Sequence, residues 1–159
     1  MDLDSADARQ HADPRQEPDE AHRRPAGVDD ATVEALGKLS EALETVEHAR
    51  GLLYGFHQTT GRADIMLGEA VGKLRAVGAD ALADRIEAEL LGRNVIAGRW
   101  TFQVVEDYDD GYWSLFRELE KLARDELAGG RRHLYEAEMK ESERSHGREG
   151  HEARPVPET

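Results

Sequence analysis

Residues 101–128 read TFQVVEDYDDGYWSLFRELEKLARDELA, and this stretch decides the fold class. When successive residues are placed about 100° apart, as in an α-helix, its apolar side chains share one face. They are Val104, Val105, Tyr108, Tyr112, Leu115, Phe116, Leu119, Leu122 and Ala123. The phase continues through Gly111, and Gly129 and Gly130 follow the last turn. The spacing therefore predicts one long helix with its apolar face in the core.

The same helical spacing recurs on both sides of this stretch. It predicts helices over 29–58, 64–78 and 80–92, and a polar helix over 131–145. No segment alternates apolar and polar residues as a strand does, so we predict an all-α fold. Short connections favour antiparallel neighbours. The expected architecture is an up-down antiparallel bundle of about four helices, with the polar C-terminal helix laid alongside or projecting.

The ends of the chain differ from its centre in composition. All five prolines lie outside the centre, at positions 14, 18, 25, 155 and 157. Both ends also combine charge with few large apolar side chains, so neither can bury enough surface to order itself. We expect a disordered acidic N-terminal segment (1–28), one helical bundle domain (29–145) and a disordered tail (146–159).

Charge and cysteine content exclude several classes of function. The chain has 159 residues, no cysteine, 34 acidic against 21 basic side chains and a net charge of −13. This charge repels phosphate backbones and anionic lipid, so we expect no nucleic-acid partner and no membrane partner. Thiolate metal sites and disulfides are excluded. Without a secretory signal or a membrane-spanning stretch, the sequence predicts cytoplasmic residence.

Two polar residues interrupt the apolar stripe of the first predicted helix. Arg50 and His57 lie within the stripe, where a charged or titratable group needs a partner. Antiparallel pairing would bring His57 towards residues 99–101 and Arg50 towards two tyrosines. One hypothesis is an inter-helical polar pocket for an anionic or aromatic small molecule, lined by Arg50, Tyr54, His57, Trp100, Tyr108 and Tyr112. The alternative is a satisfied network, or an exposed stripe end, that binds nothing.

Two large aromatic residues fall outside the apolar face of 101–128. Phe102 and Trp113 lie about 100° from its centre and would be exposed on an isolated helix. Large exposed aromatic side chains indicate a contact surface. The alternative is that the fifth helix or a neighbouring loop covers them.

Motifs for metal binding and catalysis are missing. The acidic residues Glu106, Asp107, Asp109 and Asp110 spread across the side opposite the apolar face, so we expect them to be solvated. No phosphate-binding glycine loop or Gly-x-Ser-x-Gly motif occurs, and the one Glu-x-x-His motif, Glu143 to His146, lacks the second copy that a di-iron bundle requires. We therefore expect no metal site and no cofactor, and assign no catalytic residue.

Residues 93–112, RNVIAGRWTFQVVEDYDDGY, and 130–136, GRRHLYE, resemble small helical proteins of GC-rich bacteria. The resemblance covers about residues 31–150 and implies no activity or site residue. Together these features predict a non-enzymatic protein-protein interaction or self-association module with 99–117 as its functional face. The second hypothesis is a helical bundle that binds a small ligand or metal in the inter-helical pocket and could be an enzyme.

Overall fold

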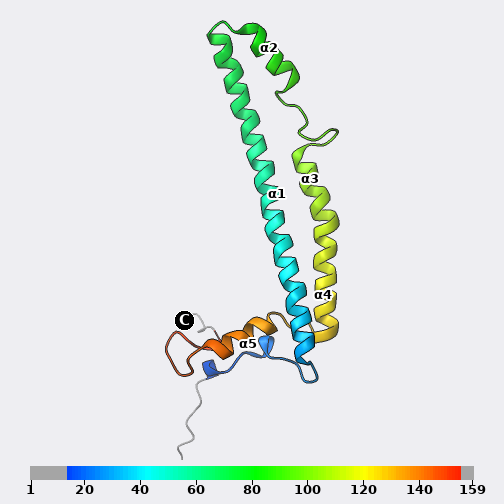
Figure 1. Cartoon of the computed structure of the whole chain (residues 1–159), viewed down its shortest axis with the longest axis vertical. Helices are drawn as coiled ribbons and strands as arrows, with labels where there is room; N and C mark the ends of the chain where they lie inside the picture. The colour runs from blue at the N-terminus through cyan, green and yellow to red at the C-terminus, as the bar shows by residue number, and fades with distance from the viewer. Residues whose placement is uncertain (1–13, 155–159) are drawn as a thin grey trace, which may run out of the picture. The chain divides into compact units, whose positions relative to one another are not determined.

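The computed structural model describes residues 14–154, over which the chain is helical and contains no strand. Figure 1 shows the elements in chain order. They are η1 (Pro14–Gln16), η2 (Glu20–His22), α1 (Asp30–Ala76), α2 (Asp80–Glu89), α3 (Thr101–Tyr108), η3 (Asp109–Trp113), α4 (Ser114–Ala128) and α5 (Leu134–Glu143). The predicted all-α class is confirmed.

α1 is a single helix of 47 residues, whereas the spacing predicts two helices separated near residues 59–63. The prediction of a break is wrong because a seven-residue repeat of buried and half-buried side chains continues through this region. Its members are Leu36, Leu39, Leu43, Val46, Arg50, Leu53, His57, Thr60, Asp64, Leu67, Val71 and Leu74. Each glycine inside α1, Gly61 included, costs about 1 kcal/mol of helix stability, which packing along so long a repeat offsets.

The stretch 101–128 is helical throughout, but η3 is a π-helical turn between α3 and α4. A π turn holds more residues than an α turn, so it changes the phase of everything after it. Leu115 and Leu119 are consequently 54% and 51% exposed, and Glu120 is buried instead. The prediction that these leucines form the core is wrong because it assumed one uninterrupted α-helical phase.

Contacts divide the chain into two compact units, of which one is residues 40–120. In this unit α1 lies antiparallel beside α3, η3 and the start of α4 (Figure 1). Three side-chain pairs set the register: Ser40 with Glu120, Arg50 with Asp109, and His57 with Thr101. The unit is thus a helical hairpin with α2 and a loop at its closed end, and it differs in topology from the predicted four-helix bundle.

The second unit combines residues up to 39 with those from 121 onward. Its core consists of Val33, Leu36, Ala128 and Leu134, so it joins the start of α1, the end of α4 and the start of α5. The Asp29 carboxylate accepts the Thr32 amide, as expected for the residue that caps α1.

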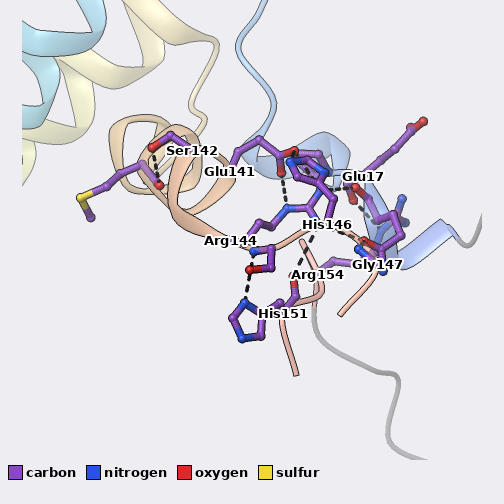
Figure 2. Close-up of polar contacts among 12 residues, drawn as sticks. Glu17, Glu141, Ser142, Arg144, His146, Gly147, His151 and Arg154 are labelled. Atoms are coloured by element: carbon purple, nitrogen blue, oxygen red, sulfur yellow. Dashed lines mark hydrogen bonds and ion pairs between the residues drawn. The ribbon is translucent and has the colours of Figure 1, made fainter. Parts of the chain in front are cut away.

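The N-terminal and C-terminal segments contact α5 through Arg144, whose side chain is fully buried. Its guanidinium donates to both carboxylate oxygens of Glu141, at 2.6 and 2.8 Å (Figure 2). It also donates to the backbone and side-chain oxygens of Gln16. The composition of 1–28 and 146–159 predicts disorder. Residues 1–13 and 155–159 lie outside the described residues, but 14–28 and 146–154 form specific hydrogen bonds that a composition argument misses.

Candidate functional site

Arg50 and Tyr54, two of the predicted site residues, meet at a carboxylate on η3. The Arg50 guanidinium donates to both oxygens of Asp109, from Nε at 2.7 Å and from Nη2 at 2.9 Å. The Tyr54 hydroxyl donates to Asp109 Oδ2 at 2.8 Å. Sequence spacing expects Asp109 on the solvated side, but its side chain is only 18% exposed. That expectation is wrong because Asp109, whose amide still donates to the Val105 carbonyl, lies one turn after the buried Val105 on the side that faces α1.

Trp113 belongs to the same cluster. Its ring lies under the Arg50 guanidinium, 4.2 Å from the ring centroid, and the Arg117 guanidinium lies 4.6 Å from it. Such cation–π contacts hold an indole in place on a helix surface. Trp113 is therefore half-buried, whereas its position on an isolated helix predicts exposure. We refer to Arg50, Tyr54, Asp109 and Trp113 as the arginine cluster.

The charges of the arginine cluster are stable near neutral pH. Hydrogen bonds from the Arg50 guanidinium hold the pKa of Asp109 below its ordinary range, despite an opposing effect of desolvation. The hydrogen bond to Asp109, followed by desolvation, raises the pKa of the Tyr54 hydroxyl. Hydrogen bonding to Asp109 also raises the pKa of Arg50. The cluster thus holds fixed charges, unlike a general acid or base, whose pKa lies near the working pH.

The other predicted site residues lie in two further groups. His57 Nδ1 is 2.7 Å from the Thr101 hydroxyl oxygen, so the predicted approach of His57 to the start of α3 is confirmed. The rings of Tyr108, Tyr112 and Phe116 follow one another along the helix, with 5.9 Å between successive centroids. The tyrosine partners expected for Arg50 from that helix are replaced by Asp109 and by Tyr54 of α1 itself.

A pocket of about 750 Å³ lies at the loop end of the hairpin, beyond His57. α1 and the 90–101 segment both contribute to its wall. The lining residues are Thr60, Gly61, Ala63, Asp64, Leu67, Leu90, Gly92, Arg93, Asn94, Val95, Trp100 and Thr101. Trp100 is the predicted site residue that lines it, and its ring makes an edge contact with Phe102 at 5.1 Å. Phe102 is 39% exposed, as its helical phase predicts.

One side of the hairpin carries large apolar side chains that nothing in the described chain covers. Leu52 and Phe56 of α1 are 63% and 42% exposed. Across from α1, Tyr112, Leu115 and Leu119 are 58%, 54% and 51% exposed. We refer to these five residues as the open face. Single exposed leucines are ordinary, but several at helical spacing indicate a contact surface.

Spacing alone missed Asp109 as the partner of Arg50, and it placed Leu115 and Leu119 of the open face in the core. A signal for Asp109 was present, because Arg50 in an apolar stripe requires a carboxylate partner and antiparallel pairing brings 109 opposite it. No comparable signal in the sequence marks the π turn. The exposure of Leu115 and Leu119 and the burial of Glu120 were therefore not predictable. The remaining acidic residues of this run, Glu106, Asp107 and Asp110, are exposed as expected.

Comparison with known proteins assigns neither a family nor a function to the chain. No family model matches the chain, and neither a curated protein nor a solved structure matches it. Within residues 14–154, none of the helices combines the length and apolar character needed to cross a bilayer.

Proposed function

We propose that this protein is a non-enzymatic self-association module in which two copies pack their open faces together. The observation that supports the proposal is the exposure of Leu52, Phe56, Tyr112, Leu115 and Leu119 on one hairpin. A second hairpin laid over them would complete a four-helix bundle, the arrangement in which paired hairpins ordinarily bury such stripes.

Helix geometry places all five residues on the same side of the hairpin. Each directly precedes a residue that faces the neighbouring helix: Leu52 precedes Leu53, Leu115 precedes Phe116, and Leu119 precedes Glu120. On each helix, these side chains are therefore rotated by about 100° from the residues that face the other helix, and the direction of rotation along the chain is the same on both helices. Because the two helices are antiparallel, equal rotations bring both stripes to one side. In a square bundle each helix contacts two neighbours at about this angle.

The shape of this side suits a second copy of the chain. At the level of Tyr112, Leu115 and Leu119, the corresponding positions on α1 are the exposed Ala42, Thr45 and Ala49. The pairs Ser40 with Glu120 and Arg50 with Asp109 bracket this level. A ridge of large side chains thus lies beside a groove of small ones. A two-fold axis places the ridge of each copy in the groove of the other, as an isologous interface requires.

The open face offers apolar surface that a dimer would bury. Full burial of a large apolar side chain stabilises by about 1.5–3 kcal/mol, so five half-exposed residues offer roughly 4–8 kcal/mol per copy. Two copies together offer about 8–15 kcal/mol, against an association cost of about 4–15 kcal/mol. This gain exceeds the lower part of the cost range, so burial of the open face can support association.

Sedimentation equilibrium of the full chain tests the proposal. We expect dimers at a chain concentration of about 100 μM, and a loss of about 100-fold in affinity for Leu115→Glu. The matched control is Leu82→Glu, which replaces a leucine of similar exposure, 52%, on α2. Circular dichroism checks that both variants remain helical. A wild-type chain that stays monomeric at 100 μM, or equal effects of the two substitutions, would overturn the proposal.

A further inference from the structure

We propose that the pocket at the loop end of the hairpin binds a small organic cation with an apolar body, through Asp64 and the ring face of Trp100. This site is separate from the open face and does not depend on self-association. Its volume, about 750 Å³, falls in the range of small-molecule sites. Its apolar wall includes Ala63, Leu67 and Leu90, and its few polar groups would fix the orientation of a ligand.

Asp64 supplies the negative charge. It is half-buried in the pocket wall, one turn beyond Thr60 on α1. Its Oδ1 accepts the Gly92 amide at 2.9 Å, which fixes the carboxylate against the loop. Within residues 14–154, no arginine, lysine or histidine forms an ion pair with it. A half-buried carboxylate with a single neutral donor retains capacity for a cationic group.

Trp100 supplies an aromatic surface in the wall of the same pocket. Its side chain is 58% exposed, and its ring contact within the described chain is the edge-to-face contact with Phe102. The second indole of the protein, Trp113, already carries the guanidinium groups of Arg50 and Arg117. Trp100 carries no such cation in the described chain. Indole is the aromatic group that attracts ammonium ions most strongly, so its ring face suits the same ligand as Asp64.

Arg93 decides between a cation and an anion as the ligand. It lines the pocket, it is exposed, and its Nη1 donates to the backbone oxygen of Glu89. At an exposed rim its charge is screened, whereas the charge of half-buried Asp64 is screened less. The net charge of −13 also favours a cation. Removing the Arg93 charge should therefore strengthen binding of a cation and weaken binding of an anion.

Nuclear magnetic resonance titrations of the full chain test the site with three probes of similar size: 2-phenylethylammonium, 2-phenylethanol and phenylacetate. We expect the ammonium probe to shift the Trp100 indole resonance and the Gly92 amide resonance, while the Trp113 indole resonance stays in place as the internal control. Asp64→Asn keeps an oxygen that can accept the Gly92 amide, and it should weaken binding at least about 5-fold. Arg93→Gln should strengthen binding about 2-fold to 3-fold.

Several outcomes would overturn the proposal. One is equal binding of 2-phenylethanol, which would show that the carboxylate takes no part. Another is tighter binding of phenylacetate with a loss on Arg93→Gln, which would assign the pocket to anions. A third is the absence of any shift at Trp100 with 10 mM 2-phenylethylammonium. Because Arg93→Gln removes no contact that joins α1 to the loop, it keeps the test valid if Asp64→Asn perturbs the fold.

Discussion

Arg50 and Asp109, 59 positions apart in the chain, are joined by two hydrogen bonds of 2.7 and 2.9 Å. The contact exists because Asp109 lies one helical turn after the buried Val105, on the side of the helix that faces α1. Bidentate contacts between guanidinium and carboxylate groups are strong and directional. The pair therefore fixes the register of the hairpin, and the side chains exposed after η3 follow from that register.

Replacing Asp109 by Asn should destabilise the hairpin. The amide keeps one acceptor oxygen but loses the charge, which leaves the half-buried Arg50 without its counter-ion. We expect thermal unfolding, followed by circular dichroism, to shift down by roughly 3–6 °C. The control is Asp110→Asn, because Asp110 is exposed and carries the same charge. Equal midpoints for the two variants would contradict the role of Asp109.

The same pair should make stability depend on pH at the acid end. Arg50 holds the pKa of Asp109 below its ordinary value of 3.8, so the folded state keeps the carboxylate ionised where the unfolded chain protonates it. This contribution is complete above about pH 5 and is lost as the pH falls through the lowered pKa. Urea unfolding from pH 7 to pH 2 should show a shallower acid decline for Asp109→Asn than for the wild type. If the free energies of unfolding of the two proteins fell in parallel with pH, Asp109 would not be a source of the acid dependence.

Two glycine-to-alanine substitutions should change the free energy of unfolding in opposite directions, because one glycine lies inside α1 and the other just after its end. A Cβ added at Gly61 meets nothing within 4 Å, and Gly61 lies inside α1. Gly61→Ala should therefore raise the free energy of unfolding by about 0.5–1 kcal/mol. Gly78 follows α1 with φ of +80°, so Gly78→Ala should lower it by about 1–2 kcal/mol. Chemical denaturation measures both, and a destabilised Gly61→Ala would contradict the continuity of α1.

The stability of the second unit, which contains the start of α1 and α5, should depend on Leu134. This residue is 6% exposed and packs with Val33, Leu36 and Ala128. Leu134→Ala removes buried methyl groups and should reduce the free energy of unfolding by about 2–4 kcal/mol. Met139 lies on the same helix but is 51% exposed, so Met139→Ala should change it by less than about 0.5 kcal/mol. A loss of stability for Leu134→Ala as small as that for Met139→Ala would show that the core around Leu134 contributes little to folding.

Much of the site follows from sequence once antiparallel pairing is assumed. Arg50 and His57 were identified because polar groups in an apolar stripe need partners, and both have partners across the hairpin. The predicted grouping of Arg50 and His57 into one pocket does not occur. Two helical turns separate them, and Arg50 pairs with η3 whereas His57 pairs with α3. The placement of Trp113 depended on Arg50 and Arg117, which hold its ring by contacts that spacing along one helix cannot predict.

By itself, the sequence determined the helical class and the apolar stripe at the start of α1, because these depend on local propensity and on spacing along one helix. The tertiary structure decided the π turn, the inward position of Asp109 and the exposure of Leu115 and Leu119. One extra residue in a turn changes the phase of every later side chain. The spacing of apolar residues along one helix does not show where such a turn lies.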